Sequence, residues 1–342
     1  MRIYDTGGML FSMSIATLKD VALLAGVSHT TVSLALRDSP LITDDTKAKV
    51  RAAAKKLNHH PNHQARSLVN RKTNVIAIVA DSFTSSSGME MLKGIEQGIR
   101  TTESDYTINM FSSMNRDDQV LSDICLGRQA DGVILISIDP SPDIIKLYSE
   151  SGCPMIAIDG NASGSIEISI DNHQGAYMAT SHLIAAGRKN LALVSGSRNP
   201  MDEMKTGFIR ALEDHGLLFD EGMVFHVDDN SHEEGQMIFK QMMNCGHGID
   251  GIFCSAGDIV ALGILAESDA EHRRIPEDIS IVGYGDDYFS SMVVPSLTTI
   301  RPPLFQVGKN GYTRMVRILN GVEKYIPYRY VYEPKLISRA SV

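Results

Sequence analysis

The strongest constraint on this fold is an alternation of apolar runs with amphipathic segments across residues 74–300. Short aliphatic runs, such as VIAIVA at 75–80 and GVILI at 132–136, are separated by longer segments whose apolar residues recur every three or four positions. Runs that are apolar throughout are typical of strands buried on both faces of a parallel sheet. The alternation therefore predicts βαβ units. It occurs in two similar sets that meet near residue 171, which predicts two α/β lobes.

The expected ligand site of such lobes is the cleft between them, because parallel sheets bind small molecules beyond the carboxyl ends of their strands. Motifs of common enzymes are missing from the sequence: there is no GxSxG, no Walker loop, and no GxGxxG after a strand. The paired acids at 228–229 and 286–287 have no matching histidine cluster, so solvated loop acids are favoured over a metal site. We therefore predict no catalytic residue, no metal site and no cofactor.

A shorter helical pattern precedes the lobes, in ATLKDVALLAGVSHTTVSLAL at residues 16–36. Apolar spacing predicts one helix that ends at Gly26 and a second that is capped by Ser28. Helix, glycine turn and helix form the helix-turn-helix plan, in which the second helix enters the major groove of DNA. A plain helical hairpin is the alternative interpretation of this stretch taken alone.

A third helix is predicted after Thr43, with acids in its first turn and lysines in its last, as the helix dipole favours. Pro61 follows it, and the segment QARSLV at 64–69 predicts a short helix that is marginal alone and suited to folding on DNA. A plain linker is the alternative. The histidines at 59, 60 and 63 do not share a helix face across Pro61, so a metal site there is disfavoured.

The charge distribution favours a nucleic-acid partner for the N-terminal region. The whole chain has a formal net charge of −9, which by itself argues against one. Residues 1–72, however, hold eleven Lys or Arg and five Asp or Glu, a net +6, so the remaining chain carries −15. A basic end on an acidic body concentrates phosphate attraction on that end. The basic residues coincide with the helix-turn-helix pattern, which strengthens the DNA interpretation.

Cysteine usage and hydropathy bear on the compartment. The four cysteines are scattered without a CxxC pair, which indicates free thiols in a reducing environment. No apolar run reaches the length of a membrane span, and residues 1–12 lack the pattern of a signal peptide. We therefore expect a cytoplasmic protein that does not associate with membranes. Residues 1–13 are predicted to be a disordered tail.

From Ala16 onward the chain resembles the LacI/GalR (lactose and galactose repressor) family of bacterial transcription regulators. The resemblance rests on five stretches that match in order and spacing, and they are TLKDVALLAGVSHTTVSLAL, NHHPNHQARSL, DNHQGAYMATSHLIAAGRKNLALVSG, IFCSAGDIVALGIL and DISIVGYGDDYFSSMVVPSLTTIRPP. It implies an all-α helix-turn-helix head and a hinge helix, followed by a two-lobed, periplasmic-binding-protein-like α/β core with parallel sheets.

The implied domains are a head over 14–60, a hinge helix or linker over 61–73, and an effector-binding and dimerisation core over 74–342. Within the core, the resemblance places 74–170 and 301–328 in lobe one, and 171–300 and 329–342 in lobe two. It also implies a homodimeric repressor that binds a near-palindromic operator and answers to a small-molecule effector, a sugar or related metabolite.

The implied DNA contacts fall on the head and the hinge. His29, Thr30 and Leu34 match the base-reading positions, and Leu34 stands where the family often has arginine, so it can pack on a thymine methyl but cannot grip guanine. Leu68 matches the leucine that wedges into a minor-groove step, and wedging kinks the duplex. The remaining implied contacts are Thr17, Ser28, Thr31, Ser33, Asn62, Ala65 and Arg66.

The implied effector site departs from the family pattern. Met204 replaces an arginine, Gly257 an asparagine, and Gly285 an aspartate that often binds sugar hydroxyls. Asp286 and Asp287 stand beside the last of these and can replace it, although the flanking glycines favour a reshaped loop. The other implied effector contacts are Asp81, Phe83, Ser137, Asp159 and Asp258. These substitutions keep an alternative open, in which the core answers to a partner protein or a phosphorylated metabolite, or no longer binds sugar. A stand-alone solute-binding protein is disfavoured by the DNA head.

Overall fold

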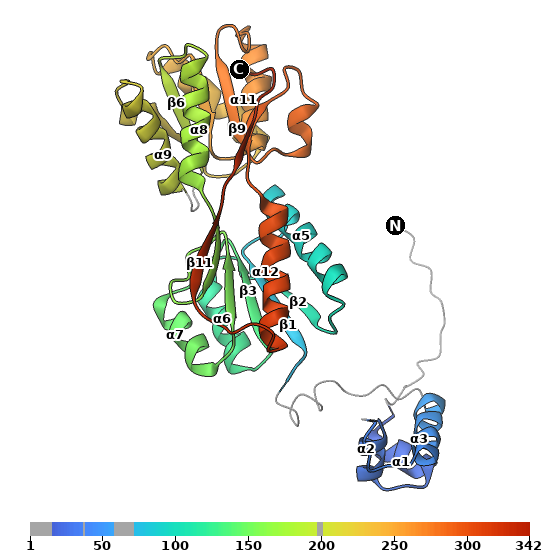
Figure 1. Ribbon diagram of the computed structural model, residues 1–342. Coiled ribbons are helices and arrows are strands. Elements are labelled where there is room, and N and C mark those ends of the chain that lie inside the picture. Colours follow the sequence, from blue (N-terminus) through green and yellow to red (C-terminus); the bar gives the residue numbers. More distant parts are fainter. Residues whose placement is uncertain (1–15, 37, 58–71, 197–200) are drawn as a thin grey trace, which may run out of the picture. The chain divides into compact units, whose positions relative to one another are not determined.

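The computed structural model describes residues 16–36, 38–57, 72–196 and 201–342, and its compact units are Met1–Lys72 and Thr73–Val342. The predicted tail over 1–13 and most of the predicted hinge over 61–73 lie outside the described residues. The two units are described separately below, and Figure 1 shows both.

The described residues of the first unit form three helices, α1 (Leu18–Ala25), α2 (His29–Leu36) and α3 (Asp44–Lys56). Thr17 and Asp20 close a capping box at the start of α1, and Gly26 ends that helix in the left-handed conformation, at φ +65°. The buried side chains that hold the three helices together are Val21, Ala22, Val32, Ala35, Val50, Ala53 and Ala54. This core is small, so the head depends on good caps as well as on apolar burial.

Lobe one of the second unit is built on a six-stranded sheet in the order β11-β5-β4-β3-β1-β2, and all of its printed pairings are parallel. Its strands are β1 (Val75–Ala80), β2 (Thr107–Ser112), β3 (Gly132–Ile136), β4 (Met155–Ile158), β5 (Ile166–Ile170) and β11 (Tyr328–Tyr332). Its helices are α5 (Ser86–Thr102), α6 (Asp117–Leu126), α7 (Pro142–Ser151) and α12 (Leu304–Leu319). The apolar runs recognised in the sequence are the buried central strands of this sheet.

Lobe two has a sheet of the same size in the order β12-β10-β9-β8-β6-β7, in which only β12 runs antiparallel to its neighbour. Its strands are β6 (Leu191–Ser195), β7 (Val224–His226), β8 (Gly251–Cys254), β9 (Ser280–Tyr284), β10 (Thr298–Arg301) and β12 (Lys335–Ile337). Its helices are α8 (Asn172–Ala185), α9 (Met201–Asp214), α10 (His232–Asn244) and α11 (Asp258–Ala270), with short 3-10 turns η1 (Glu221–Met223) and η2 (Tyr288–Ser291). The sequence-based prediction of two parallel α/β lobes is confirmed.

The chain passes between the lobes three times: from β5 to α8, from β10 to α12, and from β11 to β12 (Figure 1). The last passage corrects the predicted boundary at residue 329. Strand β11 pairs with β5 of lobe one over its whole length, from Tyr328 to Tyr332. The chain therefore enters lobe two only at β12, because the edge of the first sheet is completed before the chain crosses.

Glycines let the helices α5 and α12 of lobe one pack backbone against backbone, and Figure 1 shows the two side by side. A Cβ atom at Gly94 of α5 would lie 2.0 Å from the carbonyl oxygen of Phe305 in α12. A Cβ atom at Gly308 of α12 would lie 2.1 Å from the carbonyl oxygen of Met91 in α5. Any side chain at either position would force the helices apart.

In lobe two, two helix pairs make the same kind of backbone contact at glycine. Gly207 of α9 faces the carbonyl oxygen of His173 in α8, and a Cβ atom there would lie 2.2 Å from that oxygen. Gly235 of α10 and Gly263 of α11 face each other's helix, with Cβ positions 2.1 Å and 2.0 Å from carbonyl oxygens of Val260 and His232. Helix packing in both lobes is thus fixed by backbone contact at glycine.

We predict that Gly94→Ala destabilises the core by about 2–3 kcal/mol, because the added methyl group meets backbone atoms that cannot move independently. Gly98→Ala is the matched control on the same helix, where the Cβ would lie 3.0 Å from the Tyr312 side chain and 3.2 Å from the Lys309 carbonyl oxygen, a much milder contact than at Gly94. Its helix-propensity gain of about 1 kcal/mol offsets that contact. Urea unfolding of the full chain measures both, and equal stability of the two variants would contradict the backbone-contact argument.

Candidate functional site

The exposed start of α2 is the first candidate site. His29 and Thr30 are exposed at the first turn of this helix. Ser28 caps it, since its Oγ accepts the N–H of Thr31 at 3.1 Å and lies 2.8 Å from the Thr31 Oγ1. The cap fixes the first turn, so the two exposed side chains are presented from a defined backbone.

The other head residues predicted to contact DNA have different surroundings. Ser33 and Leu34 are half-buried on α2. The Thr17 hydroxyl group is 2.7 Å from Asp20 Oδ2 in the capping box of α1. The predicted hinge contacts, Asn62, Ala65, Arg66 and Leu68, lie outside the described residues.

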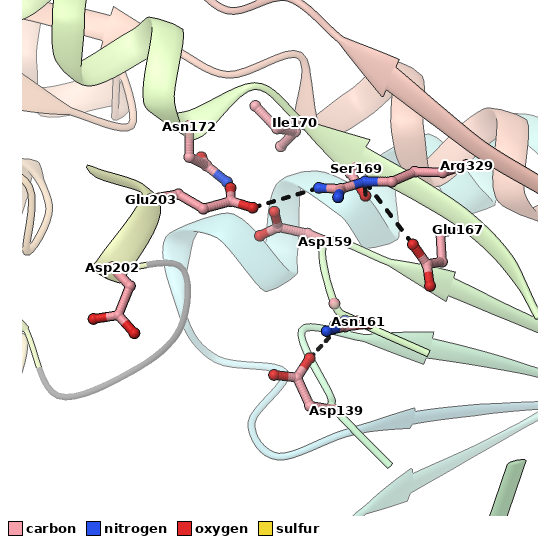
Figure 2. Close-up of a pocket in the computed structure, with 11 residues that line it drawn as sticks. Asp139, Asp159, Asn161, Glu167, Ser169, Ile170, Asn172, Asp202, Glu203 and Arg329 are labelled. Carbon is pink, nitrogen blue, oxygen red and sulfur yellow. Dashed lines mark hydrogen bonds and ion pairs between the residues drawn. The ribbon is translucent and has the colours of Figure 1, made fainter. Parts of the chain in front are cut away.

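A cleft that both lobes line is the second candidate site (Figure 2), and its cavity volume is about 170 Å³. That volume is comparable to a cavity that holds a molecule the size of benzene. The cleft lies at the carboxyl ends of β3, β4 and β5, as the fold class predicts. The lining residues are Asp139, Asp159, Gly160, Asn161, Glu167, Ser169, Ile170, Asn172, Asp202, Glu203 and Arg329.

Arg329 of β11 connects the two lobes across this cleft, as Figure 2 shows. Its Nη2 lies 3.4 Å from Oε1 of Glu203 in α9 of lobe two. Its Nε donates to Ser169 Oγ at 3.2 Å and lies 3.9 Å from Glu167 Oε2, both on β5 of lobe one. One guanidinium group is therefore shared between carboxylates of both lobes.

Asp159 is the most perturbed carboxyl group of the cleft. It follows β4 with φ +52°, and its Oδ2 accepts from Ser137 Oγ at 3.4 Å. Burial raises the pKa of Asp159 to about 7, hydrogen bonds from Asn172 and Ser137 lower it, and the charges of Glu203 and Asp139 raise it further. The group therefore titrates near neutral pH, without a cation among its described neighbours to hold it ionised.

Two of the predicted effector contacts lie in or beside lobe cores. Met204 is buried in the core of lobe two, with 3% of its surface exposed, so the substitution of arginine by methionine fills a core position and not the cleft. Phe83 packs against the core of lobe one. Asp81 accepts the N–H of Asn115 at 2.8 Å and thereby fixes the loop after β2.

The predicted contacts near β9 belong to a separate hydrogen-bond network. Asp258 is buried, and it accepts from Ser290, Thr299 and the Asp287 N–H, while burial raises its pKa to about 6. Gly257 precedes it at φ +124°. Asp286 is paired with Arg301 and Arg339, and Gly285 before it has φ +138°. These four residues hold a loop in place and do not line the acidic cleft.

Of the predicted effector contacts, the structure therefore brings Asp159 to the cleft, with Ser137 bonded to it. Sequence reasoning missed the other lining residues. Asp139, Asn161 and Asn172 follow strand ends, which is a signal that could have found them. Glu167 and Arg329 lie inside strands and are register partners in the β5–β11 pairing, which the sequence pattern does not reveal.

Comparison with known proteins matches the helical head and the α/β core each to a known protein family. The family described as bacterial regulatory proteins, lacI family, matches residues 17–62, and the periplasmic binding protein-like domain matches residues 180–342. The transcriptional repressor PurR of Yersinia enterocolitica is 31% identical, over 96% of this chain and 97% of PurR. The chain belongs to the lacI family of bacterial regulatory proteins. It is a transcriptional regulator with a DNA-binding head.

Further relatives agree with this assignment. The transcriptional regulator RegA of Clostridium saccharobutylicum is 28% identical, over 95% of this chain and 98% of RegA. The Lac repressor dimer bound to operator and the anti-inducer ONPF has the same fold, with a TM-score of 0.80, 24% identity, and coverage of 96% of this chain and 99% of that one. The CelR–cellobiose complex matches with a TM-score of 0.70 and 25% identity, over 96% of this chain and 100% of that one.

The described residues provide neither a metal cluster nor a membrane-spanning helix. No group of three or more His, Cys, Asp or Glu side chains in this part of the chain is arranged to hold a metal ion. Among the helices of the same residues, none combines the length and apolar character needed to cross a membrane.

We predict that Asp159→Asn stabilises the core by about 1–2 kcal/mol at pH 8, because it removes a buried carboxylate without a cation. The folded-state pKa is raised above the unfolded value, so the carboxyl group costs stability progressively as the pH rises from about 4 to about 7. The advantage of the variant should grow over this range and then stay constant. Urea unfolding at pH 5 and pH 8 measures it, with the exposed Asp269→Asn as control. A pH-independent difference would contradict the assignment.

Proposed function

We propose that this regulator is a repressor that binds a two-fold symmetric operator as a homodimer, and that a small molecule in the Asp159 cleft controls the binding. The observation that carries this proposal is the combination, in one chain, of a capped recognition helix and a cleft lined by both lobes. The relatives support each part: PurR is named a repressor, the Lac repressor was solved as a dimer on its operator, and CelR was solved with cellobiose.

The α2 helix supports sequence-specific reading. His29 and Thr30 are the exposed side chains of its first turn, where recognition helices contact base edges. A hydroxyl group and an imidazole ring can each donate or accept at a base edge. Leu34 offers an apolar contact one turn later. Two copies of such a head on a two-fold axis fit a symmetric operator.

We expect His29→Ala and Thr30→Ala each to weaken binding to the selected operator by about tenfold, the cost of one lost base contact. Binding to unrelated DNA should change little. The operator is first selected from random duplexes, and both affinities are then measured by fluorescence anisotropy at fixed salt. Lys56→Ala, at an exposed cation outside α2, is the control, since loss of a non-specific charge should weaken both affinities alike. Selection that recovers no symmetric site would refute the operator proposal.

Leu68→Ala tests the proposed hinge wedge. Insertion at a central base step costs unstacking energy that only the kinked operator complex recovers. The variant should therefore lose far more affinity for the operator than for unrelated DNA, in the same anisotropy assay. Equal losses on both DNAs would refute the wedge assignment.

An exposed apolar patch around η2 supports the homodimer. Tyr288, Phe289, Met292 and Val294 are 56–97% exposed, and the Tyr288 and Phe289 rings pack edge to face at 5.7 Å. Such a patch is typical of a surface that a partner covers. We expect Phe289→Asp with Val294→Asp to shift the protein from dimer to monomer in light scattering. Leu218→Asp, at a side chain that is 96% exposed outside the patch, should leave the dimer intact. A monomeric parent protein would overturn the homodimer proposal.

A further inference from the structure

The charges around the cleft narrow the class of effector. We propose that the ligand of this cleft is a small organic cation, a compound whose protonated amine binds between Asp159 and Glu203. This inference rests on the proposed function, because it assigns a ligand class to the proposed effector site.

The lining of the cleft is strongly acidic. Among its eleven described lining residues, five carry carboxyl groups and one carries a cation. The carboxyl groups belong to Asp139, Asp159, Glu167, Asp202 and Glu203, and the cation is Arg329. Carboxylates accept hydrogen bonds but cannot donate them, so these five groups favour a ligand that supplies donors. A charged cleft with protein walls also concentrates ligands of opposite sign.

The guanidinium group of Arg329 is already engaged away from Asp159. It is shared between Glu203 at 3.4 Å and Glu167 at 3.9 Å, and it donates to Ser169. Asp159 has only neutral partners in its hydrogen bonds, Ser137 and Asn172. Among the described residues, Asp159 therefore has hydrogen-bond partners but no positive partner. An ammonium group brings both the missing charge and up to three donors.

Helix N-termini, which often bind anions, are covered here by the chain's own acids. Asp171 caps α8, accepting the N–H of Gln174 at 2.8 Å. Asp202 and Glu203 lie in the first turn of α9. A phosphate group would have to compete with these carboxylates for the positive helix ends. The structure thus argues against the phosphorylated metabolite considered from the sequence.

A neutral polyol meets the hydrogen-bonding and charge requirements of the site less well than a protonated amine does. Its hydroxyl groups can donate to the carboxylates, but they leave the charge on Asp159 uncompensated in a partly buried setting. A protonated amine on the same scaffold removes that cost. The difference between matched amine and hydroxyl compounds is therefore the observable consequence of the proposal.

The test is isothermal titration of the full-length protein with matched probes. One set is glucosamine, glucose and glucose 6-phosphate, and a second is 1,4-diaminobutane, 1,4-butanediol and succinate. We expect an amine to bind at or below about 1 mM, its neutral counterpart to bind at least about tenfold more weakly, and the anion not to bind. Tighter or equal binding of a neutral or anionic member would overturn the proposal, as would the absence of binding by both amines at millimolar concentration.

Operator binding separates this inference from the proposed function. The same probes are added to the protein–operator complex in the anisotropy assay. A neutral or anionic compound that binds and shifts operator affinity would leave the proposed function standing and defeat the cation inference. An amine that binds the cleft without any effect on operator affinity would support the ligand class and contradict effector control.

Variants and pH test the geometry. Asp159→Asn should weaken amine binding by at least about tenfold, and Glu203→Gln should weaken it less, because Glu203 is shared with Arg329. Asp269→Asn is the matched control and should bind like the parent protein. Folding of each variant is checked by circular dichroism. Unchanged amine affinity in Asp159→Asn would place the ligand elsewhere and overturn the proposal.

The pH profile gives a second readout. Affinity for 1,4-diaminobutane should rise from pH 6 to pH 8, because Asp159 ionises over this range while the diamine stays protonated. The groups that face Asp159 are Glu203 of α9, Asp139 after β3, and Tyr284 of β9, and burial raises the pKa of Tyr284 well above 10, so that it stays neutral. The cleft also holds Arg329 and Glu167. Asp159→Asn should flatten the profile, and an unaltered profile in that variant would contradict the assignment.

Discussion

Backbone contact between paired helices is the constraint on which the rest of this structure depends. In lobe two, Gly207 lets α9 touch the backbone of α8 at His173. Glu203 is one turn before Gly207 on α9, and Asn172 immediately precedes His173 on α8. The contact that packs the lobe therefore also brings the first turn of α9 to the start of α8, where both line the cleft. A larger residue at Gly207 would move an acidic wall of the ligand site, so the packing and the chemistry are not independent.

Placing several carboxylates in one cleft costs electrostatic free energy, and the protein compensates the individual carboxylates unequally. Arg329 compensates Glu203 and Glu167, which face it from different lobes. The hydrogen-bond partners of Asp159 are neutral and do not offset the effect of burial, which raises the pKa of this carboxyl group. Natural folds accept such a cost chiefly at functional sites, where a ligand supplies the missing partner. By contrast, the buried Asp258 accepts three hydrogen bonds from its own chain, so its charge is compensated without a ligand.

The sequence predicted the helix-turn-helix and the two parallel lobes because both depend on periodicity, which is local. It placed the last crossing too early, because the pairing of β11 with β5 is a long-range contact. At the cleft it predicted Asp159, which follows a strand end. It missed Arg329 and Glu167, which meet only through strand register. It also assigned Met204 and Asp258 to the ligand, although the structure buries Met204 among apolar side chains and surrounds Asp258 with donors. The sequence pattern alone does not reveal whether a side chain finds its packing or hydrogen-bond partners within the folded chain.

The position of Arg329 indicates how ligand binding can change the contact between the two lobes. Its contact with Glu203 joins β11 of lobe one to α9 of lobe two, next to one of the three chain passages. A cation that binds Asp159 and Glu203 competes with the guanidinium group for the same carboxylate, so it changes the free energy of the contact between the lobes. If operator affinity differs between lobe arrangements, the operator must change the affinity for the cation by the same factor. Under the proposed cation binding, the ion pair would couple ligand charge to lobe arrangement, whereas a neutral ligand that leaves the ion pair intact would discriminate less between lobe arrangements.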